Sequence, residues 1–125
     1  MKKIVHTDAA PAAIGPYSQA NIANGMVYVS GQLGMDPATG ELKEGLEAQA
    51  EQALNNLKAI LEAAGSGLDE VVKTTVFLAK MTDFSIFNAV YAKYFPSDCP
   101  ARSCFAVAGL PKGGLVEVEA IASVK

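Results

Sequence analysis

The chain has 125 residues, of which 50% are hydrophobic and 18% are charged. This length fits one domain, residues 1–125, with a hydrophobic core, and the low charged fraction suggests contacts between subunits. Thirteen acidic and ten basic side chains give a net charge of −3, and the basic ones are scattered along the chain. Nucleic-acid binding needs a concentrated basic surface, so the charge pattern argues against it.

The N-terminal segment and the cysteines bear on the compartment. Lys2 and Lys3 are not followed by the apolar run of a signal peptide, and no window approaches the ~20 apolar residues of a membrane span. Cys99 and Cys104 lack the further ligands that a zinc site needs, since the only histidine, His6, is remote in sequence. We therefore expect a cytoplasmic protein with free thiols, a surface histidine, no metal and no membrane partner.

The first predicted element is a β-hairpin. Asn24-Gly25 is typical of a type I′ turn, which needs positive φ at both central residues. In the strand that follows, residues 26–30, Val27 and Val29 lie on one face and alternate with larger or polar side chains. A polar loop, MDPATGEL, comes next.

Two amphipathic helices are predicted. The first spans about residues 45–64, because its apolar residues recur at steps of three and four, and Gly65 stands where a helix commonly ends. The second begins at Thr82 or Asp83 and stops before Pro96. Its aromatic and apolar stripe comprises Phe84, Phe87, Val90, Tyr91 and Tyr94.

Three further strands complete the pattern. Residues 71–78 are rich in β-branched side chains and apolar on both faces of the expected strand. Residues 102–107 and 115–124 form the last two strands, the second of which points Glu117 away from its valine and alanine stripe. The connection between these strands favours their pairing, which would bring Arg102 close to Glu117, although the register stays open.

The order of elements predicts an α+β or α/β fold, in which a mixed sheet of about six strands carries two helices on one face. Two helices cannot cover both faces of such a sheet. The strand at residues 71–78 is apolar on both faces, so its second face needs a cover that the chain itself does not supply. We therefore expect self-association through the open face of the sheet.

Familiar catalytic templates are absent: the sequence contains no P-loop, no G-x-G-x-x-G, no H-E-x-x-H and no G-x-S-x-G. A set of polar or small residues in otherwise apolar or tight segments remains as the candidate site. The set comprises Tyr17, Ser30, Gly31, Asn88, Arg102, Cys104 and Glu117. Arg102 stands out, because its nearest acidic neighbour in sequence is Asp98 and an unpaired buried guanidinium is costly.

Two interpretations of Arg102 stay open. In the structural one, the guanidinium is the counter-ion of Glu117 and Glu119, and the other members of the set are ordinary packing or surface residues. In the functional one, Arg102 holds a ligand carboxylate in a bidentate fork, a geometry that lysine cannot copy. Glu117 would then act on a proton or a water molecule in the same pocket.

Several segments carry a family resemblance, and together they cover essentially the whole chain. They are APAAIGPYSQA, VYVSGQLGMDPATGEL, NLKAILEAAGS, FNAVYAKYF and PARSCFAVAGLPKGGLVEVEAIA. The last is the most specific, since its Pro-Ala-Arg is followed at a set distance by an apolar-Glu-apolar triplet. In these motifs the chain resembles the RidA (YjgF) family of small reactive-imine deaminases.

The resemblance implies a chorismate-mutase-like single domain that forms a homotrimer, with the three sheets in a central barrel and ligand sites between subunits. It also implies hydrolysis of 2-iminobutanoate and 2-iminopropanoate to 2-oxo acids and ammonia, without a cofactor. Pyridoxal-phosphate dehydratases that act on threonine or serine would supply these imines.

For the candidate residues, the resemblance implies that Arg102 anchors the substrate carboxylate and that Glu117 positions or activates water. No metal takes part. The remaining members line the cleft or offer it walls and backbone hydrogen bonds: Tyr17, Ser30, Gly31, Asn88 and Cys104.

Other functions stay open beside this one. A non-catalytic trimer that binds 2-oxo acids or amino acids would use the same Arg102 pocket, and only Glu117 would separate it from an enzyme. RNA cleavage or translation inhibition, attributed to some relatives, fits poorly with the acidic charge balance. A chaperone-like role leaves no mark in the sequence.

Overall fold

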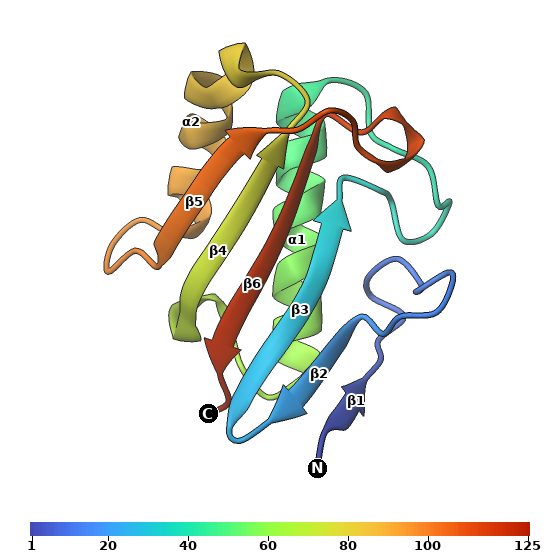
Figure 1. Ribbon diagram of the computed structural model, residues 1–125, viewed down its shortest axis with the longest axis vertical. Coiled ribbons are helices and arrows are strands. Elements are labelled where there is room, and N and C mark those ends of the chain that lie inside the picture. Colours follow the sequence, from blue (N-terminus) through green and yellow to red (C-terminus); the bar gives the residue numbers. More distant parts are fainter.

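The computed structural model describes residues 1–125, and its central element is a six-stranded mixed sheet. The strands are β1 (Lys3–Val5), β2 (Ala20–Ala23), β3 (Met26–Leu33), β4 (Val71–Leu78), β5 (Ala101–Ala106) and β6 (Val116–Ser123). They lie in the order β1-β2-β3-β6-β4-β5 (Figure 1). Two helices, α1 (Leu46–Ala63) and α2 (Phe84–Tyr94), pack on one face of the sheet (Figure 1), which confirms the predicted fold class.

The hairpin between β2 and β3 has the predicted turn. Asn24 and Gly25 adopt φ angles of 52° and 74°, as a type I′ turn requires. Val27 and Val29 are buried on the helix side of the sheet, and Tyr28 between them faces the other way. The type I′ turn and the alternation of buried side chains therefore specify the same pairing register of β2 and β3.

Both helices begin and end close to the predicted positions. α1 ends ahead of Gly65, whose φ of 78° lets the chain turn, and the Ser66 amide donates to Leu61 O at 2.8 Å. α2 follows the short 3₁₀ turn Met81–Asp83 and ends ahead of Pro96. Neither helix is long and apolar enough to cross a membrane. The residues of α1 with no exposed surface are Ala50, Ala53, Leu54, Leu57, Ile60 and Leu61.

The position of β5 differs from the prediction. β5 pairs with β4 in parallel and β6 pairs with the other side of β4, so β4 separates the two strands that were expected to pair. The reason is the connection through α2: a helix that packs back on the sheet returns the chain parallel to the strand it left. β6 then enters between β3 and β4. Arg102 and Glu117 therefore lie on strands that are not neighbours.

Only the helix-covered face of the sheet is fully buried within one chain. Val76 and Leu78 of β4 have no exposed surface, while Phe77 between them is half-buried on the opposite face. On that opposite face, which we call the open face, Tyr28 and Phe105 are 47% and 45% exposed. As predicted, one chain leaves the second face of its central strands without a cover.

Gly34 fixes the distance between β3 and α1, because a Cβ atom there would overlap the backbone of Gln49. Backbone cannot move aside as a side chain does, so we expect Gly34→Ala to lower the free energy of unfolding by about 2 kcal/mol or more. Gly109→Ala is the matched control, since nothing lies within 4 Å of its Cβ position. Urea unfolding followed by circular dichroism measures both variants, and equal midpoints would contradict this close contact.

Candidate functional site

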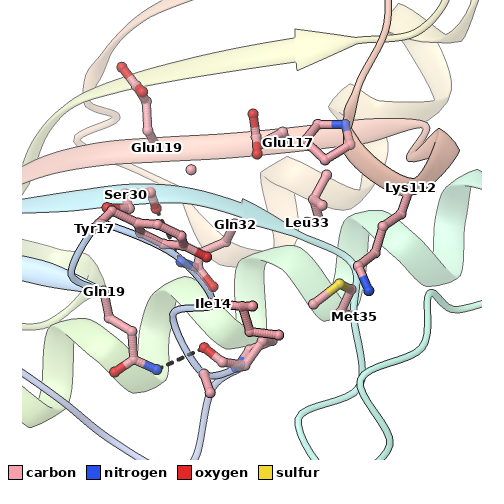
Figure 2. A pocket seen from close by; sticks show the side chains of 14 residues that line it. Ile14, Tyr17, Gln19, Ser30, Gln32, Leu33, Met35, Lys112, Glu117 and Glu119 are labelled. Carbon is pink, nitrogen blue, oxygen red and sulfur yellow. Dashed lines mark hydrogen bonds between the residues drawn. The ribbon is translucent and has the colours of Figure 1, made fainter.

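A cavity of about 670 Å³ opens beside the end of β3 and the start of β6 (Figure 2). The segment of residues 11–19 forms one wall, and the turn that contains Lys112 contributes another. The cavity brings together some of the predicted site residues from distant parts of the chain. These are Tyr17, Ser30, Gly31 and Glu117.

Glu117 faces the cavity from β6 and is half-buried there (Figure 2). Burial, and in second place the charge of Glu119, raises the pKa of its carboxyl group. Gly31 leaves room for this carboxyl, because a Cβ atom on residue 31 would lie 2.7 Å from Glu117 Cδ. The irregular register between Val29 and Gln32 places Gly31 opposite the carboxyl. The site thus holds a carboxylate with raised proton affinity, as a general base requires.

Ser30 ties the wall at residues 11–19 to β3, and Gln19 ties the same wall to the N-terminal segment before it. Ser30 donates its hydroxyl to Ser18 O at 2.6 Å, and its amide donates to Gln19 O at 2.9 Å. Gln19 is only 2% exposed and donates its side-chain amide to backbone carbonyls of the N-terminal segment. Gln19 and Gln32 both line the cavity, and neither was predicted, because a glutamine in such a segment carries no sign of its burial.

Exposed apolar groups and one basic side chain surround the mouth of the cavity. Ile14 is 76% exposed and Tyr17 is 53% exposed, and both line the cavity (Figure 2). Large apolar side chains that are this exposed favour contact with a ligand or another chain. Lys112, with a φ of 58°, is the one basic residue of the lining. Neither Ile14 nor Lys112 was predicted as a site residue.

The other three predicted residues, Asn88, Arg102 and Cys104, do not line this cavity; Arg102 instead contacts α2 on the helix-covered side. Its Nη1 donates to Asn88 Oδ1 at 2.8 Å, and its guanidinium carbon lies 4.7 Å from the ring centre of Tyr91. None of the ion pairs in the chain includes Arg102. The interpretation in which the β6 glutamates are its counter-ions is therefore wrong within one chain.

Cys104 lies on the same side of β5 as Arg102. Burial raises the pKa of its thiol, and the opposing effect of the Arg102 charge is smaller. A protonated thiol is a poor nucleophile, so the structure does not favour covalent catalysis through Cys104. Both cysteines are free, as predicted, and His6 lies at the surface, 3.1 Å from Asp8. No group of three or more histidine, cysteine, aspartate or glutamate side chains gathers as a metal site.

Comparison with known proteins decides the family. The family described as Endoribonuclease L-PSP matches residues 7–124. The chain belongs to this family. A curated relative, the 2-iminobutanoate/2-iminopropanoate deaminase of Bos taurus, is 56% identical over 123 residues, which cover 98% of this chain and 90% of the relative. The predicted resemblance to the RidA family is confirmed.

Solved structures of similar proteins agree with the fold. The crystal structure of RidA from the Antarctic bacterium Psychrobacter sp. matches with a TM-score of 0.95 and 51% identity, over 98% of this chain and 99% of that one. The crystal structure of E. coli TdcF with bound serine matches with a TM-score of 0.94 and 43% identity, again over 98% and 99%. The sheet and the two helices are therefore those of the L-PSP fold.

In this L-PSP domain the candidate residues form two groups on different sides of the sheet. The cavity group supplies a carboxylate with raised pKa, Glu117, and the backbone of Ser30 and Gly31. The β5 group supplies an uncompensated cation, Arg102, and its amide partner Asn88. An amino-acid-like ligand needs a cation for its carboxylate and a base near its reactive carbon, and among the predicted residues each group offers only one of these.

Glu117 gives the L-PSP domain a defined pH dependence. Folding raises the pKa of the Glu117 carboxyl above its ordinary value of 4.5. Protonation of this carboxyl therefore stabilises the folded state in full below about pH 4.5. The contribution is lost as the pH rises through the pKa of the folded state. We therefore expect Glu117→Gln to raise the unfolding temperature at neutral pH, with a gain that shrinks in acid. Thermal unfolding between about pH 3.5 and 7.5 measures this gain. A gain that grows toward acid pH would contradict the direction of the shift.

Proposed function

We propose that this protein hydrolyses 2-imino acids such as 2-iminobutanoate and 2-iminopropanoate to 2-oxo acids and ammonia. The observation that carries the proposal is Arg102, a guanidinium that no carboxylate of the chain neutralises and that an amide and two aromatic rings hold in place. A cation in this state is suited to bind a ligand carboxylate. The deaminase of Bos taurus, 56% identical, supports the reaction, and the serine bound in TdcF supports a ligand that carries an amino-acid carboxylate.

The proposed mechanism needs orientation and one activated water molecule. Arg102 holds the carboxylate in a bidentate fork, so that the adjacent imine carbon has a fixed position. Glu117 takes a proton from water as the oxygen attacks this carbon, and its raised pKa strengthens it as a base. Glu117 passes this proton to the imine nitrogen, which gives a tetrahedral intermediate with one hydroxyl and one amino group. The hydroxyl proton then passes to the same nitrogen through Glu117 as the C–N bond breaks, which releases ammonia and leaves the 2-oxo acid. The proposal uses no cofactor and no metal.

The two groups of residues meet only if chains assemble, so the proposal includes a homotrimer. A substrate of four carbon atoms cannot contact Arg102 on one side of the sheet and Glu117 on the other within the same chain. The open face presents Tyr28, Phe77 and Phe105 as an apolar surface for association. In the proposed trimer the open faces form a central barrel, and the β5 group of one subunit completes the cavity of the next.

The substrates of this reaction are short-lived imines, so another enzyme must form and release them before this protein acts. Pyridoxal-phosphate dehydratases that act on threonine or serine are the proposed source. A coupled assay with a threonine dehydratase, in which semicarbazide traps the free imine, therefore tests the function.

We expect the protein to accelerate formation of 2-oxobutanoate in this assay and Arg102→Ala to reduce kcat/KM by about 100-fold, because the carboxylate loses its charged partner. Arg102→Lys should restore only part of the loss, since an ammonium cannot form the bidentate fork. Lys58→Ala, which removes an exposed cation from α1, is the matched control and should leave the rate unchanged. Full activity of a folded Arg102→Ala variant would contradict the assignment.

Shared sites predict complementation between two inactive variants. When Arg102→Ala and Glu117→Gln chains are unfolded together and reassembled at equal amounts, about one quarter of the inter-subunit sites regain both groups. Activity should return toward that fraction of the unmodified protein, and light scattering should give the mass of three chains. If each chain holds a complete site of its own, the mixture stays inactive.

The bound serine of TdcF also favours a second candidate: a protein that binds a small amino or 2-oxo acid without turning it over. Binding of 2-oxobutanoate with no effect in the semicarbazide assay would support this candidate. RNA cleavage finds less support, because the cavity lining holds two carboxylates, Glu117 and Glu119, beside a single basic side chain, and carboxylates repel phosphate.

A further inference from the structure

One side of α2 supports the guanidinium of Arg102 with three residues, which we call the seat: Phe84, Asn88 and Tyr91. Its central carbon, Cζ, lies 4.7 Å from the ring centre of Tyr91 and 5.5 Å from that of Phe84. Asn88 accepts a hydrogen bond from Nη1 at 2.8 Å. The three residues follow one another at helical spacing, so they lie on one stripe of the helix. The seat therefore comes from a rigid element and not from a loop.

Tyr91 is itself fixed from behind. Its hydroxyl lies 2.7 Å from the hydroxyl of Thr74, a residue with no exposed surface on β4. Thr74 is the register partner of Arg102 in the parallel pair of β4 and β5. The ring of Phe95 packs against Tyr91, with ring centres 4.7 Å apart. The strand beside Arg102 thus holds the ring on which the guanidinium rests.

The chemistry of the seat leaves the cation free to bind. Aromatic faces attract a guanidinium through their quadrupole but accept none of its in-plane hydrogen bonds. Asn88 takes only Nη1, and Nε and Nη2 donate to no group of the chain. A carboxylate in place of Asn88 would form an internal ion pair and compete with the ligand. The neutral amide orients Arg102 without neutralising it.

We propose that Tyr91, fixed by Thr74, and Asn88 are positioning residues that hold Arg102 for a planar carboxylate ligand. The proposal rests on the function proposed above, because it assigns that carboxylate to a 2-imino or 2-oxo acid. An arginine side chain that is already ordered loses little further conformational freedom when the ligand binds, so preorganisation raises affinity. The effect therefore belongs to binding and not to the chemical step.

The test compares Tyr91→Leu with a core variant away from Arg102, Val27→Ala, in the full-length protein. Calorimetry with 2-oxobutanoate gives Kd, the semicarbazide assay gives KM and kcat, and thermal unfolding gives the loss of stability. Loss of the cation–π contact in Tyr91→Leu should raise Kd and KM by about 3- to 30-fold, with kcat within about twofold. Val27→Ala removes buried apolar atoms on β3, which β6 and β4 separate from β5, and should lower stability while leaving Kd and KM unchanged. Equal shifts of Kd in both variants would overturn the proposal.

Asn88→Asp is a second test that does not disturb the core. The variant has nearly the same shape but places a charge 2.8 Å from Nη1, so it should raise Kd by at least tenfold. Asn88→Ala should raise Kd less than Asn88→Asp does, since it removes an anchor without adding a competitor. If Asn88→Asp binds 2-oxobutanoate as tightly as the unmodified protein, the positioning role is overturned, even where Tyr91→Leu fails to fold.

The two proposals fail in different ways. If the unmodified protein binds 2-oxobutanoate but hydrolyses no imine, the deaminase function is overturned, and the Kd values still decide the role of Tyr91 and Asn88. If the unmodified protein hydrolyses imines and neither Tyr91→Leu nor Asn88→Asp changes KM, the function stands and the positioning role is overturned.

Discussion

The two helices cover one face of a six-stranded sheet, and the features of the candidate site depend on that asymmetry. On the covered side, α1 and the valines of β6 form a closed core. On the open face, aromatic side chains such as Tyr28 and Phe105 share the surface with Glu117 and Glu119. Association of this aromatic and acidic surface with another protein surface lowers the free energy, because it buries apolar side chains. The Glu117 carboxylate on this surface is already partly desolvated within one chain.

The edge position of β5 is a second constraint on the molecule. The parallel crossover through α2 brings Arg102 to the last strand of the sheet, where one side has no strand partner. Groups on such a strand can be approached by a ligand or by a neighbouring chain. The rings of Phe84 and Tyr91 and the amide of Asn88 stabilise the cation there, and no carboxylate of the chain neutralises it. The structure thus keeps a charge in a fixed place and still available, which an internal ion pair would not do.

Local rules of sequence predicted much of this structure. Asn24-Gly25 encodes the hairpin, the apolar stripe defines α1, and the alternation in β6 turns Glu117 away from the buried valines. The pairing of β5 with β4 was not predictable in the same way, because it depends on how α2 packs on the sheet, far from either strand in sequence. The residue types of the site came from motifs, whereas their division between two sides of the sheet follows from topology. The burial of Gln19 was hidden for a similar reason, since the loop that it ties is what buries it.

The protonated thiol of Cys104 matters for a protein proposed to receive imines. The carbon atom of an imine is electrophilic, so a thiolate can add to it. The reacting form of cysteine is the thiolate, and burial lowers the thiolate fraction of Cys104 further by raising the pKa of its thiol. The desolvation that disqualifies Cys104 as a nucleophile therefore protects the protein from alkylation by the compounds it would consume.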